Sequence, residues 1–361
     1  MNRQSEFQRQ QNWIQETLRS ENASALLITY LPHIQWLCGF TGSNGVLIVQ
    51  RDEMHLITDR RYEIQASLEV SDAQIHISTH NLINFVQSQN LIKKSDRLLF
   101  QPEYITFDAI EQWKANLTKI KLFPRKNLLN PLVAIKSKRA IEGMRHSQSI
   151  SDAVFNEILP RINTGIKENE LAAIIDYQHR LFGASAMAFD TIVAFGENSA
   201  LPHARPTDRK LKNDESILLD FGCIANGYAS DMTRTIFHGT PTQEFQIAYN
   251  SVKTAQSNAV KMANNEVLAS EVDSAARGSL KEYGFEEYFA HSTGHGIGIE
   301  VHEWPSISNK SIAQLLNGYT VTIEPGVYFP EKFGIRIEDT VLICSNQCER
   351  LSSIGRDLIV I

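Results

Sequence analysis

The sequence predicts a mixed α/β protein built from two domains. With 361 residues, the chain is long enough to bury two separate hydrophobic cores. Segments with the apolar pattern of strands alternate with segments of helical periodicity in both parts of the chain. The stretch NLLNPLVAIK at 127–136 contains a proline, precedes a long helical pattern and indicates a boundary. These observations predict a smaller N-terminal α/β domain at residues 1–130 and a larger domain at residues 131–361.

The N-terminal domain is expected to alternate helices with short strands. Its first helix is predicted at residues 6–20, where Trp13, Ile14 and Leu18 lie on one side at helical spacing. A Gly-Ser-Asn turn at 42–44 leads into a strand. Strands are predicted at 25–30, 45–49, 55–58 and 99–104, and further helices at 59–70 and 106–117.

The larger domain is expected to contain helix pairs followed by strands. Pro160 and Gly183 end two of the predicted helices, and Asp273, three residues after Ser270, resembles a capping box at the start of another. Helices are predicted at 137–159, 167–182, 242–263 and 270–284, and strands at 189–196, 217–221, 228–236, 320–324 and 335–341.

Each of the two central strands of this domain carries one acidic residue, Asp220 and Asp231. Asp220 lies between Leu219 and Phe221, and an unpaired carboxylate buried in such an apolar strand costs several kcal/mol, roughly. A positive charge must therefore meet it. The sequence leaves two explanations open, a capped turn or ion pair with Arg234 and the coordination of a metal ion.

Other residues with ligand chemistry follow in three later segments. The stretch HSTGHGIGIEVHE at 291–303 sets His295 among glycines, Glu324 ends a β-branched strand, and Glu338 lies in an apolar strand. Carboxylate and imidazole ligands without sulfur suit a borderline-hard divalent ion. Because four carboxylates carry more negative charge than one divalent ion neutralises, two ions with bridging carboxylates are predicted.

Six motifs resemble those of the pita-bread metallopeptidases and occur in the same order. They are LPHARP at 201–206, LLDFG at 218–222, SDMTRT at 230–235, HSTGHGIGIEVHE at 291–303, TIEPGVY at 322–328 and GIRIEDT at 334–340. Within that family the chain is similar to the Xaa-Pro branch, which comprises Xaa-Pro aminopeptidase and Xaa-Pro dipeptidase (prolidase). The resemblance implies a C-terminal pita-bread (creatinase/aminopeptidase) domain. It also implies a smaller creatinase-like α/β domain before it, because residues 36–49 and 56–66 resemble that domain.

The resemblance also assigns roles to individual residues. It implies that two metal ions are bound by Asp220, Asp231, His295, Glu324 and Glu338. Asp231 and Glu338 would bridge the two ions. The substrate site would be lined by His203, His291 and His302. The spacing of the residues adds two more roles. Arg336 lies two residues before Glu338 on the same strand face and Thr233 lies two residues after Asp231, so each is expected to steady a ligating carboxylate.

The implied activity is hydrolysis of the N-terminal Xaa-Pro bond of a peptide by a water or hydroxide that bridges the metal ions. Glu324 is expected to take the proton of this water, with a role as a metal ligand only as the alternative. His203 and His302 would hydrogen-bond the substrate carbonyl. An aminopeptidase is favoured over a dipeptidase. The intact ligand set argues against a metal-free creatinase-like enzyme and against a non-catalytic binding protein.

Composition restricts the partners and the surroundings of the protein. A net charge of −6 and a pI near 6.0, without a Lys/Arg cluster, argue against nucleic acid as a partner. A polar N-terminus and the lack of an apolar run of ~20 residues predict a cytoplasmic protein without a membrane partner. The four cysteines form no CxxC motif and are expected to be reduced. The resemblance favours Mn²⁺, with Co²⁺, Zn²⁺ or Fe²⁺ as alternatives, and implies a homodimer.

Overall fold

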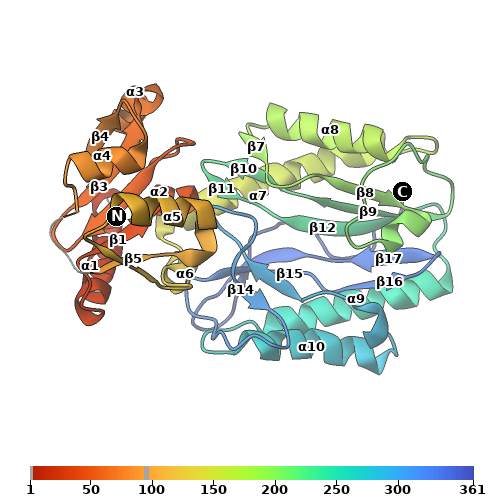
Figure 1. The fold of residues 1–361 in the computed structure, drawn as a ribbon. Helices are drawn as coiled ribbons and strands as arrows, with labels where there is room; N and C mark the ends of the chain where they lie inside the picture. The colour runs from red at the N-terminus through yellow and green to blue at the C-terminus, as the bar shows by residue number, and fades with distance from the viewer. Residues whose placement is uncertain (1–2, 93–96) are drawn as a thin grey trace. The chain divides into compact units, whose positions relative to one another are not determined.

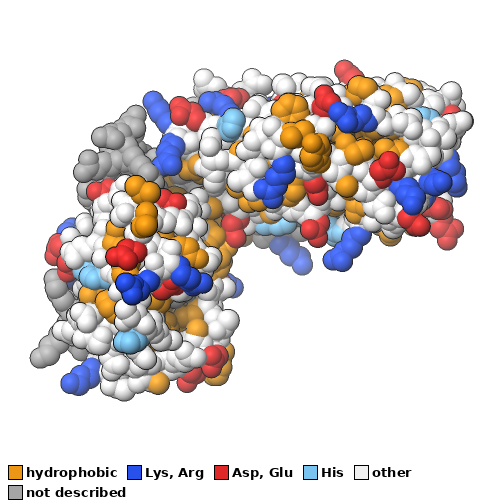
Figure 2. All heavy atoms as spheres, turned by 90° about the horizontal axis from the view of Figure 1, so that it is seen from above, with side chains coloured by type: hydrophobic (Ala, Val, Ile, Leu, Met, Phe, Trp, Pro, Cys, Tyr) orange, Lys and Arg blue, Asp and Glu red, His pale blue; other side chains and the backbone are white. Residues whose placement is uncertain are grey.

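The chain folds into two compact units, Met1–Val133 and Ala134–Ile361. The computed structural model describes residues 3–92 and 97–361, with side chains from residue 10 onward (Figure 1). Among the residues described, no helix is both long and apolar enough to cross a lipid bilayer. Basic and acidic side chains are interspersed on the face shown in Figure 2.

A six-stranded mixed sheet forms the centre of the N-terminal unit, in the order β4-β3-β2-β1-β5-β6. Antiparallel pairing joins β2 to β1 and β3, whereas the remaining pairs are parallel. The strands are β1 (Ala25–Ile28), β2 (Val46–Gln50), β3 (Met54–Asp59), β4 (Gln74–Ser78), β5 (Arg97–Phe100) and β6 (Lys121–Pro124). Side chains of β1 alternate between two cores, with Leu26 and Ile28 in one and Ala25 and Leu27 in the other.

Helices contribute to both of these cores. Ile14 and Leu18 of α1 pack in the core of Leu26, whereas Val86 of α4 and Trp113 of α5 pack in the core of Leu27. The helices are α1 (Arg3–Ser20), α2 (Leu31–Cys38), α3 (Glu63–Glu69), α4 (Leu82–Ser88), α5 (Phe107–Asn116) and α6 (Asn130–Ala134). The sequence analysis did not predict α2 and α4, because seven or eight residues are too few to display a helical period.

The first half of the C-terminal unit packs two helices against short strands. Helices α7 (Lys138–Ile158) and α8 (Glu168–Leu181) share a core with β8 (Ile192–Phe195), β9 (Glu215–Phe221) and β12 (Met232–His238). These three strands form a sheet in the order β12-β9-β8. A second small sheet contains β7 (Ala186–Met187), β10 (Cys223–Ala225) and β11 (Tyr228–Ala229).

The second half repeats this plan with α9 (Gln243–Met262) and α10 (Ala269–Glu282). Its sheet has the order β14-β13-β15-β18-β19, and a β16-β17 hairpin lies beside it. The strands are β13 (Gly294–Gly296), β14 (Glu303–Ile307), β15 (Thr320–Ile323), β16 (Gly326–Phe329), β17 (Phe333–Arg336), β18 (Asp339–Leu342) and β19 (Glu349–Arg350). In Figure 1 the strands of the unit lie between α7 and α8 on one side and α9 and α10 on the other.

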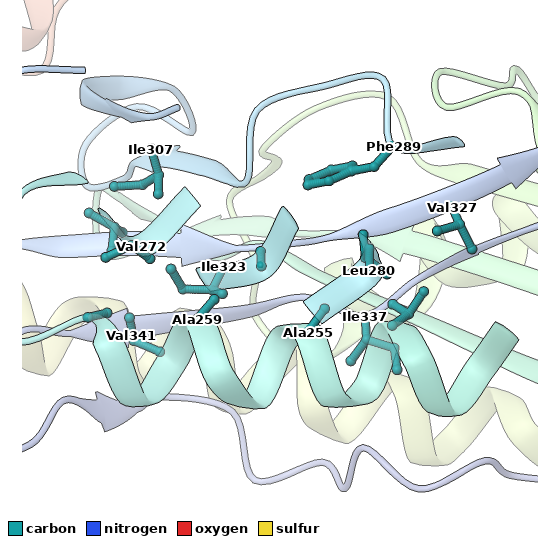
Figure 3. Packing of buried hydrophobic residues seen from close by; sticks show 14 of the residues in the cluster. Ala255, Ala259, Val272, Leu280, Phe289, Ile307, Ile323, Val327, Ile337 and Val341 are labelled. Carbon is teal, nitrogen blue, oxygen red and sulfur yellow. The ribbon is translucent and has the colours of Figure 1, made fainter. Parts of the chain in front are cut away.

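Helix α9 buries a face of small residues against this sheet. Ala255 and Ala259 point toward Ile323, Ile337 and Val341 in the same core (Figure 3). Small side chains let the helix backbone approach the strands closely.

The start of α10 differs from the prediction. The helix begins at Ala269, and the Glu271 side chain accepts a hydrogen bond from Leu268 N at 2.9 Å. Asp273, which was expected to cap the helix, instead accepts a hydrogen bond from Thr293 Oγ1 at 2.7 Å and forms an ion pair with Arg277. The predicted capping role of Asp273 is wrong, because Thr293 and Arg277 provide it with partners inside the fold.

The central strands of the first half pair in antiparallel register, with Asp220 opposite Thr233 and Phe221 opposite Met232. Between them, β10 and β11 form a hairpin whose turn residues Asn226 and Gly227 have φ of 52° and 79°. This left-handed conformation is why the turn contains asparagine and glycine.

Gly222 connects β9 to this hairpin at a close backbone approach. A Cβ atom at this position would lie 1.9 Å from Ser230 O. We expect Gly222→Ala to lower the free energy of unfolding by about 1–3 kcal/mol, because backbone must move to admit a methyl group. Urea unfolding measures the effect.

Gly278→Ala is the control, because nothing lies within 4 Å of that position on α10. It is expected to raise stability by about 0.5–1 kcal/mol, and equal effects of the two substitutions would contradict this account.

Candidate metal centre

A cavity of about 440 Å³ in the C-terminal unit is lined by nine of the ten residues that the sequence analysis assigned to the site, all except Thr233. The residues are Asp220, Asp231, His203, His291, His295, His302, Glu324, Arg336 and Glu338. They come from both halves of the unit, and residues at the β12-β9-β8 sheet and at the β14-β13-β15-β18-β19 sheet both line the cavity.

The ends of strands position the acidic and imidazole side chains. Asp220 is the penultimate residue of β9, and Asp231 immediately precedes β12. In the second half, His295 lies within β13, Glu324 follows β15 and Glu338 precedes β18. Regular pairing of the strands thus fixes the backbone of each residue, while its side chain reaches the cavity.

Three of these side chains converge closely. Asp231, His295 and Glu338 each offer one ligand atom, and the three atoms lie within 4.8 Å of one another. His295 Nε2 is 3.6 Å from Asp231 Oδ2 and 3.5 Å from Glu324 Oε1. His295 Nδ1 lies 3.0 Å from Gly296 O and donates to it, and burial lowers the pKa of the ring. In the resulting neutral tautomer, the lone pair of Nε2 faces two carboxylates.

Two buried carboxylate oxygens that belong to residues of the cavity have no hydrogen-bond partner among the described residues. These atoms are Asp220 Oδ1 and Glu338 Oε1. A buried anionic oxygen without a donor is costly, whereas coordination of a cation compensates for the lost hydration. Together with the lone pair of His295, these oxygens fit divalent metal ions as their missing partners.

Arg336 is the cation that meets Asp220. Its Nη2 donates to Asp220 Oδ2 at 2.6 Å, and its Nε donates to Thr233 Oγ1 at 3.1 Å. The Thr233 hydroxyl in turn donates to Glu338 Oε2 at 2.7 Å. The ion pair with Arg234 that the sequence left open for Asp220 is therefore wrong, because Arg234 binds Asp339 instead.

The sequence analysis missed the role of Tyr328, which connects Arg336 to His291. Arg336 Nη1 donates to the Tyr328 hydroxyl at 2.7 Å, and that oxygen lies 2.8 Å from His291 Nε2. His291 Nδ1 lies 2.8 Å from Ser292 O, and burial lowers the pKa of His291 to about 3. The ring is therefore neutral, donates a hydrogen bond through Nδ1 and accepts one from the Tyr328 hydroxyl at Nε2. In the sequence, an aromatic residue within the apolar strand GVYF is typical of core packing.

The remaining two histidines are exposed to solvent at the cavity. His203 lies in the 201–206 segment, and His302 stacks edge-on against His295 with ring centroids 4.4 Å apart. Phe189, Ile192 and Val301 add an apolar wall to the same cavity. The cavity thus combines anionic ligand groups, exposed imidazoles and an apolar surface.

Comparison with known proteins assigns this arrangement to a family. Residues 142–345 match the model of metallopeptidase family M24, and residues 11–132 match the creatinase/prolidase N-terminal domain. The chain belongs to metallopeptidase family M24. The predicted resemblance and fold class are therefore confirmed, and the larger unit of this M24 peptidase has the pita-bread fold.

Relatives of the M24 peptidase cover almost its whole length. The Xaa-Pro dipeptidase of Pyrococcus furiosus is 35% identical over 316 residues, which is 87% of this chain and 89% of the relative. A solved structure of an X-Pro aminopeptidase from Thermotoga maritima has a TM-score of 0.89 at 33% identity, covering 95% of this chain and all of that one. The Xaa-Pro dipeptidase from Bacillus anthracis has a TM-score of 0.94 at 32% identity, with 98% and 99% coverage.

Glu168 anchors the segment that carries His203. This carboxylate is fully buried at the start of α8. It accepts hydrogen bonds from Phe195 N at 2.8 Å, Asn198 Nδ2 at 3.0 Å and Thr207 Oγ1 at 2.6 Å. The two ends of the segment that contains His203 are thereby held to one side chain of the M24 peptidase.

A buried ion pair anchors the loop that carries His302. Lys136 Nζ lies 2.6 Å from Glu303 Oε2, and the other oxygen of Glu303 accepts from Ile299 N at 2.8 Å and Glu300 N at 3.2 Å. Both side chains are nearly inaccessible to solvent. The pair closes the loop between β13, which contains His295, and β14.

We expect the cavity carboxyls to make the metal-free M24 peptidase less stable, relative to its manganese-bound form, as the pH rises. Burial and neighbouring carboxylates raise the pKa of Asp231 and Glu338, and burial raises the pKa of Glu324 from 4.5 to about 7. When a carboxyl has a higher pKa in the folded than in the unfolded protein, its protonated form stabilises the fold. This stabilisation is complete at a pH below the pKa in the unfolded protein, and it is lost as the pH rises through the pKa in the folded protein. For Glu324 the loss amounts to about 3 kcal/mol between pH 4.5 and 7.

Thermal melting of chelated protein between pH 5 and 8 measures this effect. Saturating manganese is the control, because a bound cation favours the ionised carboxylates and should remove the decline in melting temperature. The same decline with and without manganese would contradict the assignment of these carboxylates to a metal site.

Proposed function

We propose that this M24 peptidase uses two divalent metal ions to hydrolyse the bond between an N-terminal residue and a following proline. The observation that carries the proposal is the convergence of Asp231, His295 and Glu338 ligand atoms within 4.8 Å, in a cavity with exposed histidines. Relatives named Xaa-Pro dipeptidase and X-Pro aminopeptidase support the same bond specificity.

In this proposal Asp220, Asp231, His295, Glu324 and Glu338 would hold the divalent ions. When bound, divalent ions lower the pKa of water from ~15.7 toward ~7 and polarise a carbonyl group. Arg336 and Thr233 hold Asp220 and Glu338 in orientation through the hydrogen bonds described above.

The side chains of the protein move the protons. Glu324 takes a proton from the attacking water and delivers it to the proline nitrogen as the C–N bond breaks. His203 and His302 donate hydrogen bonds to the substrate carbonyl oxygen, where negative charge develops. His291 is fixed by Tyr328 and contributes its ring to the wall of the substrate site.

The apolar wall of Phe189, Ile192 and Val301 is suited to the proline ring. The bond before proline is a tertiary amide without an N–H, and the ring fixes its φ angle. A site accepts an Xaa-Pro peptide bond if it does not need this nitrogen to donate a hydrogen bond and if it contacts the apolar proline ring.

We infer an aminopeptidase that accepts peptides longer than two residues, because His203 and His302 are solvent-exposed and leave the cavity accessible. A dipeptidase is the second candidate. It is favoured by the exposed guanidinium of Arg205, which lines the cavity and could bind a free proline carboxylate.

Cleavage of three matched peptides tests the proposal. Chelated enzyme supplied with manganese is given Xaa-Pro, Xaa-Pro-Yaa-Zaa and Xaa-Ala-Yaa-Zaa. Cleavage of both proline peptides, with the alanine peptide intact, is expected for the aminopeptidase, and cleavage of Xaa-Pro alone identifies the dipeptidase. Preferential cleavage of the alanine peptide would refute the proline specificity.

We also propose manganese as the metal, a homodimer as the assembly and the cytoplasm as the location. Oxygen-rich ligation supports manganese, with cobalt, zinc and iron as the competing ions. The free thiols of Cys38, Cys223 and Cys348 are buried and suit a reducing compartment. Metal analysis of the isolated protein and light scattering test the metal and the assembly.

A further inference from the structure

Arg234 is a buried arginine that lies behind the candidate metal ligands rather than among them. Its side chain is 2% exposed, and all of its nitrogens donate hydrogen bonds. Nε donates to Gly355 O at 2.9 Å, and Nη2 donates to Ile354 O at 2.9 Å and to Asp339 Oδ1 at 2.6 Å. Arg234 lies in β12, three residues after Asp231, and Asp339 follows Glu338 at the start of β18.

The guanidinium lies where the β12-β9-β8 sheet meets the β14-β13-β15-β18-β19 sheet. Strands β12 and β18 belong to different sheets, and Glu338 N donates to Thr233 O at 3.1 Å across the junction. Arg234 Nη1 donates to the carbonyl oxygens of both of these residues, at 2.9 Å to Thr233 and 2.5 Å to Glu338. A single nitrogen, Arg234 Nη1, therefore holds the backbone of β12 to the backbone of Glu338.

Asp339 is itself fixed from the opposite side. The carboxylate is fully buried, and its Oδ2 accepts from Gln256 Nε2 of α9 at 2.9 Å and lies 3.6 Å from Arg350 Nη1. Gln256 Oε1 in turn accepts a hydrogen bond from Arg356 Nη1. Since every polar atom of this group has a defined partner, the position of the guanidinium relative to the two strands is strongly determined.

Stability alone is a weak explanation for such a group. Replacing a buried ion pair with well-packed apolar residues is often neutral or stabilising, so burial of a full charge pair points to another role. The donation to two strand carbonyls, each within two residues of a candidate bridging carboxylate, indicates that role.

We propose that Arg234 and Asp339 are positioning residues that set the distance between the carboxylates of Asp231 and Glu338. The proposal rests on the proposed function, because it assumes that these two carboxylates share the metal ions. The pair joins the two sheets at the point where each contributes a bridging ligand, so that the site is already shaped before metal binds.

Manganese binding to chelated protein tests the proposal by calorimetry, alongside thermal melting. Arg234→Lys keeps a positive charge facing Asp339 but loses the donation to the two carbonyls. Arg209→Lys is the control, because Arg209 forms a largely buried pair with Glu215, 2.6 Å away and outside the metal cavity. We expect the manganese Kd of Arg234→Lys to rise roughly 10- to 100-fold, while Arg209→Lys binds like the wild type. In steady-state cleavage, kcat should fall more than KM rises.

Equal manganese affinity of the two lysine variants would overturn the positioning role, even if Arg234→Lys melts at a lower temperature. If Arg234→Lys does not fold, Asp339→Asn carries the same test, because asparagine keeps the shape of the side chain and removes the anion that orients the guanidinium. Wild-type affinity in folded Asp339→Asn would then overturn the proposal. If the wild type binds no manganese, the proposed function fails. If the wild type binds manganese and the folded variants bind it equally well, only the positioning role fails.

Discussion

Glu338→Gln is expected to reduce kcat/KM by about 10³-fold or more and to lower the amount of bound manganese. Glutamine keeps the shape of the side chain and the hydrogen bond with Thr233, but it removes the charge of the unpartnered Oε1. Metal activation supplies several kcal/mol, and each 1.36 kcal/mol corresponds to a tenfold change in rate. Asp231→Asn is expected to act in the same way. Peptide cleavage and metal analysis on the same preparation measure both effects.

Glu349→Gln is the control for this loss. Glu349 forms an exposed pair with Arg145 at 2.7 Å, far less enclosed than the cavity carboxylates. The control should keep full activity and full metal content. Retention of activity in Glu338→Gln, with metal content unchanged, would contradict the assignment of Glu338 as a metal ligand.

Lys136→Met is expected to destabilise the protein by about 3–5 kcal/mol, because it leaves the buried Glu303 carboxylate without its cation. Glu303 also accepts from two backbone N–H groups of the loop between His295 and His302. The variant should therefore show a raised KM in addition to a lower melting temperature. Denaturant unfolding and steady-state kinetics measure the two effects separately.

Lys332→Met provides the matched control for the lysine substitution. Lys332 and Glu244 are also 2.6 Å apart, but both side chains are more than half exposed. Exposed pairs typically contribute about 0.2–1 kcal/mol, so this substitution should be nearly neutral. A similar loss of stability in the two variants would show that burial of the Lys136 pair is not the cause.

The acidic residues of the site were predictable from local sequence, because an Asp or Glu in an apolar strand contradicts the pattern around it. Asp220 and Glu338 stand out in this way, and the structure brings both to one cavity. Their partners were not predictable. The cation that meets Asp220 is Arg336, 116 positions away, rather than Arg234. Local sequence cannot distinguish two arginines whose positions depend on how two sheets meet.

The anchoring residues were missed for a related reason. Glu168 resembles an ordinary acidic residue in the first turn of a helix, where it complements the helix dipole. Its burial against Asn198 and Thr207 depends on a loop about 30 residues later. Lys136 and Glu303 are separated by 167 positions. Buried polar pairs of this kind follow from the tertiary fold and leave no periodic signal in the sequence.

The most direct measurement is a manganese titration of chelated wild-type protein in which bound metal and cleavage of Xaa-Pro-Yaa-Zaa are followed in one sample. We expect two manganese ions per chain, with cleavage before proline increasing as the sites fill and absent from Glu338→Gln in the same titration. Cleavage that persists in the chelated protein, or a chain that binds no manganese and leaves the peptide intact, would contradict a two-metal Xaa-Pro peptidase.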